Sequence, residues 1–130
     1  MNADTRESVI STLDVLLAAR KLIEKPENWC QRFLSKRPDG SSQIGMPADD
    51  ACAYCMNGAI FAVVKRRSIH WSMNSQAAIE ALERLTGEPN INFNDTHTHA
   101  EVIALFDRAI EAERGVRETE PSPQPGTKEA

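Results

Sequence analysis

Two cysteines and two histidines have types and spacings that could support chemistry. Cys52 and Cys55 lie three residues apart in the stretch ACAYCMNGAI, and His97 and His99 form a His-x-His pair. On one helix the cysteines would lie on neighbouring faces, and zinc binds both thiolates and imidazoles. The spacing between the two pairs matches no zinc-finger pattern. We therefore keep a Cys/His metal site as the alternative and predict no metal and no cofactor.

The same cysteines could act in redox or nucleophilic chemistry. A thioredoxin-like Cys-x-x-Cys follows a strand, whereas a turn-rich approach, MPADD, precedes Cys52. The two aspartates of this approach would raise the pKa of the first thiol. Cys55, His97 and Asp95 would supply the groups of a small enzyme if the fold brought them together. We favour a protein without catalysis, in which the cysteines are small buried hydrophobic residues.

A second group of residues predicts a binding surface. Asn94 and Asp95 are adjacent polar residues before Thr98, which already forms a capping box with a glutamate three residues later. One helix start does not need all of these caps, so the surplus predicts a polar site. Trp29 is typical of a core anchor with a hydrogen-bonded indole, although an exposed Trp29 would favour binding. We predict that Trp29, the 36–50 loop and Asn94–Asp95 form the surface.

Helices must position these residues, because apolar side chains recur at spacings of three and four. The predicted helices cover residues 8–22, 28–34, 51–67, 75–85 and 98–113. Asp4, Thr5 or Ser8 would cap the first helix, and Pro26 follows its end. The second helix would bury Trp29 and Phe33. The prediction is an all-α fold, a compact single domain of about five helices.

The segments between and after these helices carry turn signals. Residues 36–50 contain Pro38, Gly40, Gly45 and Pro47, which predict a long surface loop of consecutive turns. The short stretch NINFND is predicted to be extended. Three prolines and a lack of large apolar residues predict a disordered tail over 114–130, so that the helical domain covers 1–113.

Length, composition and charge limit the class of protein. The 130 residues, 41% of them hydrophobic, suffice for one domain with a buried core. A net charge of −4 gives no field that attracts nucleic acid, and Lys65-Arg66-Arg67 would complement a helix dipole. No apolar run could cross a membrane, and the N-terminus lacks signal-peptide features. We expect a cytoplasmic protein with reduced thiols and no membrane or nucleic-acid partner.

Three short motifs resemble a known family. Trp29-Cys30, the stretch CMNGAI at 55–60 and Phe93-Asn94-Asp95, followed by AEVIALFDRAI, are similar to the uncharacterised bacterial and phage domain-of-unknown-function family 6197. Its members look like Trp-Cys, Cys-x-x-Gly-Ala-Ile or Leu, and Trp-Asn-Asp, and the resemblance spans roughly residues 10–112. Cys52 lies outside these motifs, which weakens the zinc interpretation. Phe93 replaces the tryptophan of the family pattern.

The resemblance adds a biological setting to the predicted binding role and names no ligand. A family spread among bacteria and phages suggests an accessory module of phage–host or mobile-element biology, with a protein as the expected partner. Gly58 and Ala59 would let another helix approach closely, at a cost of about 1 kcal/mol in helix propensity for the glycine. A second copy of the chain could use the same face, so a homodimer is a further expectation.

Overall fold

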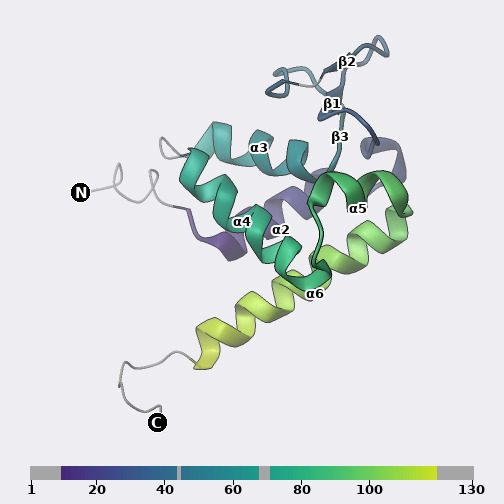
Figure 1. The fold of residues 1–130 in the computed structure, drawn as a ribbon. Helices are drawn as coiled ribbons and strands as arrows, with labels where there is room; N and C mark the ends of the chain where they lie inside the picture. Colours follow the sequence, from purple (N-terminus) through teal and green to yellow (C-terminus); the bar gives the residue numbers. More distant parts are fainter. Residues whose placement is uncertain (1–9, 44, 68–70, 120–130) are drawn as a thin grey trace, which may run out of the picture.

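The computed structural model describes residues 10–43, 45–67 and 71–119. In that part of the chain there are five α-helices, one short 3-10 helix and a three-stranded antiparallel sheet (Figure 1). The fold is therefore mostly helical rather than all-α. In chain order the elements are α2 (Thr12–Leu22), η1 (Pro26–Asn28), β1 (Ser35–Lys36), β2 (Ser42–Gln43), β3 (Ala53–Tyr54), α3 (Met56–Arg67), α4 (Trp71–Thr86), α5 (Asn90–Thr96) and α6 (His99–Thr119).

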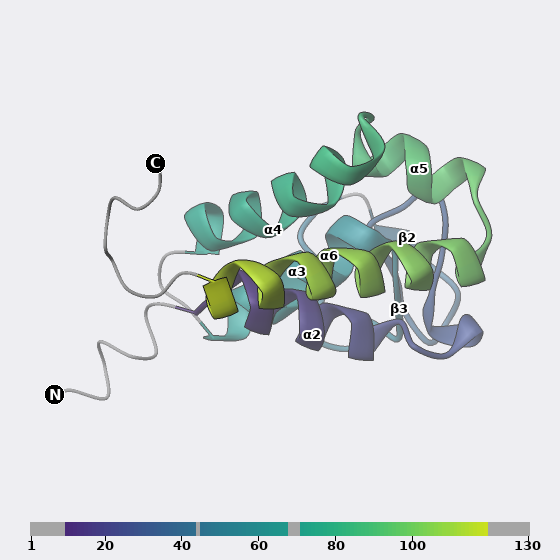
Figure 2. The same ribbon diagram turned by 90° about the horizontal axis from the view of Figure 1, so that it is seen from below.

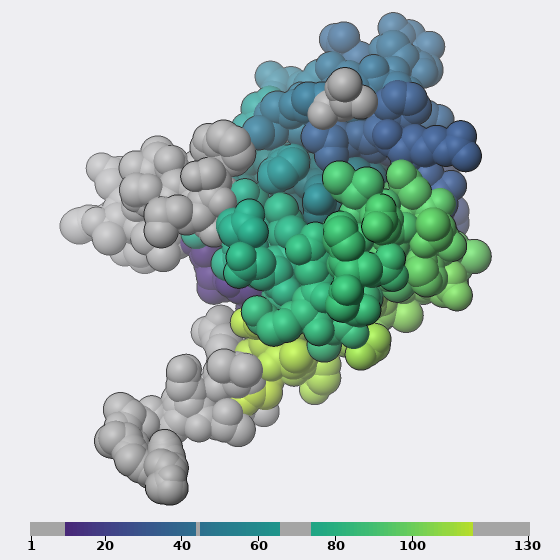
Figure 3. All heavy atoms as spheres, viewed as in Figure 1, coloured from purple at the N-terminus to yellow at the C-terminus, as the bar shows by residue number. Residues whose placement is uncertain are grey.

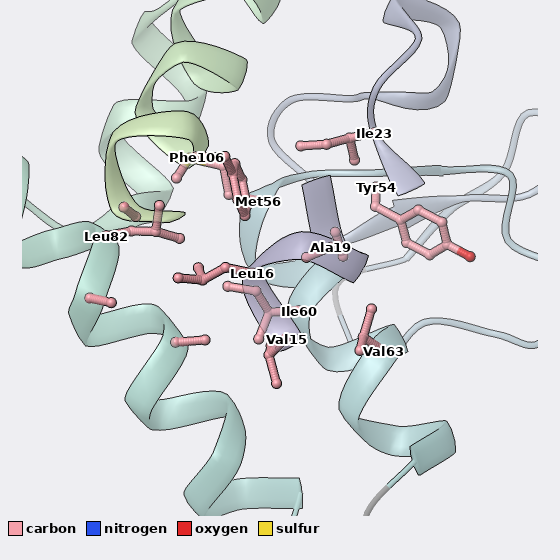
Figure 4. Close-up of a cluster of buried hydrophobic side chains, with 14 of the residues drawn as sticks. Val15, Leu16, Ala19, Ile23, Tyr54, Met56, Ile60, Val63, Leu82 and Phe106 are labelled. Atoms are coloured by element: carbon pink, nitrogen blue, oxygen red, sulfur yellow. The ribbon is translucent and has the colours of Figure 1, made fainter. Parts of the chain in front are cut away.

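Helices α2, α3, α4 and α6 enclose one apolar core (Figure 2). Leu16 of α2, Ile60 of α3, Leu82 of α4 and Phe106 of α6 are all fully buried in it, and Figure 4 shows side chains from these helices meeting. Burial of an apolar side chain of this size contributes about 1.5–3 kcal/mol. The core thus fixes the helices, and α5 packs on α3 and α4 at one end of the bundle.

The helix termini agree with the predicted signals at three places. Thr98 and Glu101 form the predicted capping box: the Thr98 N–H donates to Glu101 Oε1 at 2.8 Å, and the Glu101 N–H donates to Thr98 Oγ1 at 3.2 Å. Gly87 follows the end of α4 with a φ of +77°, as a helix-terminating glycine does. Helix α2 ends at Leu22, as predicted.

The start of α2 differs from the prediction. Ile10 and Ser11 are not helical, and the Ser11 side chain caps the helix by accepting the Asp14 N–H at 3.0 Å. The caps considered earlier in the chain, Asp4, Thr5 and Ser8, lie outside the described residues. Apolar spacing alone did not separate the first turn of the helix from the chain that enters it.

The sheet corrects the all-α prediction. Strand β1 pairs with β2 on one side and with β3 on the other, and Trp29 forms a parallel bridge with Tyr54. A hairpin turn around Gly40, with a φ of +91°, connects β1 to β2, and Asp39 Oδ1 accepts the Ser41 N–H at 2.8 Å. Each strand has two residues, too few for the alternation that reveals a strand in a sequence.

Helix α3 begins at Met56 rather than at Ala51, because Ala53–Tyr54 pair with β1. Two of the residues predicted to be helical, Ala53 and Tyr54, therefore belong to the sheet. Cys52 precedes β3 and is exposed, whereas Cys55 follows β3 and is buried. The premise that both cysteines share one helix is wrong.

Four further segments differ from their predicted conformation or bounds. Residues 29–34, most of the helix predicted over 28–34, are not helical, since η1 ends at Asn28. The stretch NINFND is helical, because it forms most of α5. Helix α4 begins at Trp71 instead of residue 75. Helix α6 continues to Thr119, six residues past the predicted boundary of the helical domain, and residues 120–130 lie outside the described part of the chain.

No helix within the described residues is long and apolar enough to span a membrane.

Candidate functional site

The side chain of Asn94, on α5, is the centre of a buried hydrogen-bond network. It is 1% exposed. Its Oδ1 accepts the Trp29 indole N–H at 2.8 Å and the Met56 backbone N–H at 3.0 Å. Its Nδ2 donates to the Cys30 carbonyl at 3.1 Å and to Asp95 Oδ1 at 3.3 Å. An asparagine amide has two lone pairs and two N–H groups, so its hydrogen-bonding capacity is filled. We call these five residues the Asn94 hub.

The Asn94 hub joins three segments that are distant in sequence. Met56 is the first residue of α3, where a backbone N–H has no partner within its own helix. Asn94 supplies that partner from α5 and at the same time holds the segment that contains Trp29. The ring of His99, on α6, lies against the Trp29 ring with 5.7 Å between centroids. The hub therefore sets the position of the chain between η1 and β1.

That chain has a strained backbone at Arg32. Its φ is 78°, in the left-handed region, which costs a non-glycine residue about 1–2 kcal/mol. The Arg32 N–H donates to Asp95 Oδ1 at 2.7 Å. Gln31 Nε2 donates to the carbonyl oxygens of Asn94, at 3.0 Å, and His97, at 3.2 Å. Contacts with the α5 region thus hold the strained conformation, and such held strain is common at ligand sites.

A pocket of about 310 Å³ opens beside the Asn94 hub. It lies between the segment before β1, the start of α3, and α5, and we call it the α3–α5 pocket. Figure 3 shows α5 bordering the segment before β1 on the molecular surface. The wall is mostly apolar. Two of its apolar side chains, Phe33 and Ile91, are nevertheless accessible to solvent, with exposed fractions of 38% and 56%. The lining residues are Arg32, Phe33, Leu34, Cys55, Asn57, Phe61, Ile91, Asn94 and Asp95.

Gly58 permits the close packing that forms one wall of this pocket. A Cβ atom at position 58 would lie 1.8 Å from the Leu34 carbonyl oxygen, which also accepts the Cys55 N–H at 3.2 Å. The close approach is therefore made by the backbone of Leu34 and not by another helix. Ala59 is fully buried in the core of its own chain. A second copy of the chain would have to contact a different surface.

The two buried thiols are poor nucleophiles. Burial is the main reason that the pKa of Cys30 rises from 9.0 to about 11, and the nearby Cys55 adds to it. Burial also raises the pKa of Cys55, although its Sγ accepts the Gly58 N–H at 3.3 Å. Because the thiolate is the reactive form, both side chains are protonated and unreactive near neutral pH.

The side chains of His97 and His99 contact groups other than the cysteines. The His97 ring stacks on Phe93 with 3.7 Å between centroids, and its Nδ1 lies 2.9 Å from the Phe93 carbonyl oxygen. His99 Nε2 lies 2.7 Å from the Ile23 carbonyl oxygen. Among the described residues, no three or more His, Cys, Asp or Glu side chains are placed to hold a metal ion. The structure thus does not assemble the alternative site of Cys52, Cys55, His97 and His99.

The match to a family model comes from the part of the chain that builds this site. Residues 7–112 match the model of a family of unknown function (DUF6197). The chain belongs to this family. No curated protein and no solved structure matches it significantly. Family membership brings no activity with it, so the function of this DUF6197 protein has to be argued from the pocket and the hub.

Two of the three predicted binding residues line the pocket of this DUF6197 protein. Asn94 and Asp95 belong to its wall. Trp29 does not line it: the side chain is half-buried and its indole N–H is bound to Asn94, as in a core anchor. The predicted 36–50 loop forms the β1–β2 hairpin and the approach to β3, outside the pocket wall.

Other pocket residues were missed in the sequence. Phe33 was predicted to be buried, but it is exposed, because no helix forms around it. Ile91 could have been found by treating NINFND as helical, since Ile91, Asn94 and Asp95 have spacings of three and four. Nothing in the sequence marks the left-handed backbone of Arg32, because that conformation depends on the contact with Asp95.

Proposed function

We propose that this protein is a non-catalytic binding module whose α3–α5 pocket holds one large apolar side chain of a partner protein. The observation that carries the proposal is a mostly apolar pocket with exposed Phe33 and Ile91 among its lining residues. Exposed apolar residues that surround an apolar cavity are typical of interaction sites. An anchor side chain in a pocket, surrounded by contacts that exclude water, is the usual energetic centre of a protein interface.

The size of the pocket favours a single side chain over a large cofactor. Its 310 Å³ is at the lower end of the roughly 300–1,000 Å³ usual for small-molecule sites. Phe33 and Ile91 extend the apolar surface beyond the cavity. A partner that fills the cavity with one side chain and covers these two residues would bury more apolar area than a small ligand could.

The site is organised before a partner arrives. The Asn94 hub fixes α5 against the start of α3, and Asp95 fixes the backbone of Arg32. A pre-organised site loses less conformational entropy on binding, so a larger share of the contact energy contributes to affinity. This supports a binding role for the strained segment before β1.

The alternative, a small enzyme that uses Cys55, His97 and Asp95, has less support. Burial raises the pKa of Cys55, and in the described structure its thiol is hydrogen-bonded to a backbone amide rather than to an imidazole. His97 instead contacts Phe93 and Thr96. A nucleophilic cysteine needs a base within hydrogen-bond reach.

We place this module in the cytoplasm of a bacterium or of a phage-infected bacterial cell. All three cysteines are free, which is typical of proteins in a reducing compartment. The bacterial or phage origin rests on the motifs of the resembling family. Nucleic acid is not the proposed partner, because a net charge of −4 gives no field that attracts it. Lys65 of the basic cluster also donates to the Pro47 carbonyl at 2.9 Å and lies 3.5 Å from Asp49.

Selection from a random peptide library displayed on phage tests the proposal. The immobilised protein should enrich peptides that share one large aliphatic or aromatic residue. Ile91→Lys should abolish their binding because it places a charge beside the cavity, and since Ile91 is exposed, the variant should fold. Leu17→Lys, a matched change at a 37% exposed position on α2, should retain binding. Failure to enrich any such peptide, or equal binding to the Ile91→Lys variant, would contradict the proposal.

A further inference from the structure

We propose that the partner of the α3–α5 pocket carries a cationic group next to its apolar anchor, and that Asp95 binds this cation. This inference rests on the proposed function, because it specifies the occupant of the same pocket. Asp95 lines the pocket among mostly apolar neighbours. A carboxylate beside an apolar cavity is unusual for a surface that serves apolar contacts alone.

The Asp95 carboxylate is held in one orientation. Its Oδ1 accepts two hydrogen bonds, from the Arg32 N–H at 2.7 Å and from Asn94 Nδ2 at 3.3 Å. Its Oδ2 has no hydrogen-bond partner within the described ranges of the chain. The carboxylate therefore retains acceptor capacity, and its position is already fixed. An ammonium or guanidinium group could bind there with a charge-assisted hydrogen bond.

The negative charge of Asp95 is not neutralised by an ion pair with the described residues. The ion pairs in that part of the chain join Arg20 to Asp107, Arg37 to Asp50 and Lys65 to Asp49.

Arg32 also lines the pocket, but its guanidinium forms no ion pair with the Asp95 carboxylate that holds its backbone. The chain as a whole carries a net charge of −4, which favours the approach of a cationic segment.

Three synthetic peptides test the inference on the unmodified protein. They share the apolar anchor enriched from the library and differ at the neighbouring position, which is Lys, Gln or Glu. Affinities are measured by fluorescence polarisation. We expect the Lys peptide to bind about fivefold more tightly than the Gln peptide, as for a partly exposed ion pair. The preference should decrease in high salt, because ions screen exposed charges.

Two charge-matched variants test whether the preference for the Lys peptide comes from Asp95. Asp95→Asn keeps an oxygen that can accept the Arg32 N–H, and it should reduce the Lys-to-Gln affinity ratio to about one. Glu111→Gln, which removes the same charge from an exposed position on α6, should leave the ratio unchanged. Circular dichroism verifies that both variants are folded.

The outcomes separate the two proposals. Equal affinity for the Lys, Gln and Glu peptides, or a preference for Glu through Arg32, would overturn the role of Asp95 while the apolar pocket remains supported. The role of Asp95 would also be overturned if Glu111→Gln reduced the ratio as much as Asp95→Asn. Absence of any peptide binding that depends on Ile91 would overturn the proposed function itself.

Discussion

At the scale of single residues, Asn94 has a structural role, and Asp95 is the residue that we propose for binding. The Asn94 amide has all of its hydrogen-bonding capacity filled by protein groups, so it has no free group for a ligand. Asp95 uses one oxygen for structure and retains the other. The sequence suggested a polar site at this pair because two caps exceeded what one helix start needs. It could not distinguish a saturated amide from an available carboxylate, because every partner outside this adjacent pair comes from a position more than 30 residues away.

The residue-scale prediction concerns the Asn94 hub. Asn94→Ala would leave the Trp29 indole N–H, the Met56 N–H and the Cys30 carbonyl without their partner. Each buried polar group that loses its partner costs about 1–3 kcal/mol, so we expect a loss of about 3 kcal/mol in the free energy of unfolding. Urea denaturation measures it. The control is Asn92→Ala on the exposed face of α5, which should cost less than about 0.5 kcal/mol. Similar losses for both variants would refute a central role of Asn94.

At the scale of elements, the sequence predicted the long helices well and the segment around the pocket poorly. Periodic apolar residues locate α2, α3, α4 and α6, because each helix buries a face in the common core. The strands have two residues each, and α5 has seven, so neither carries a readable pattern. Their conformations are set by tertiary contacts: β1 pairs with two partners, and Asn94 connects α5 to α3.

The element-scale prediction uses two helical glycines with opposite surroundings. Gly115→Ala on α6 adds a Cβ with no atom within 4 Å, so the gain in helix propensity should stabilise the protein by up to about 1 kcal/mol. Gly58→Ala gains the same propensity but forces a Cβ against the Leu34 backbone carbonyl. Overpacking of this kind typically costs about 1–3 kcal/mol, so the expected net effect is destabilising. Thermal unfolding of both variants shows whether each change raises or lowers the stability. A stabilised Gly58→Ala variant would contradict the close contact between Gly58 and the Leu34 carbonyl.

At the scale of the whole molecule, a helical core supports, at one end, the small surface that we propose for binding. The helices α2, α3, α4 and α6 provide the stable core, and the sheet and α5 lie together beyond the start of α3 (Figure 1). The pocket forms where these parts meet, and its wall therefore combines residues from 32 to 95. Such a combination could not be predicted from local sequence patterns. Membership of the DUF6197 family identifies relatives of the chain without identifying its partner.

The most direct test of the central claim is an NMR measurement of the protein with a library-enriched peptide. We predict intermolecular nuclear Overhauser effects between the apolar anchor of the peptide and the side chains of Ile91 and Phe33, because both line the pocket and are exposed. The Trp29 indole N–H should remain hydrogen-bonded to Asn94, since Trp29 does not line the pocket that the peptide fills. Effects confined to another surface, such as the exposed Leu17 on α2, would contradict a binding role for the pocket.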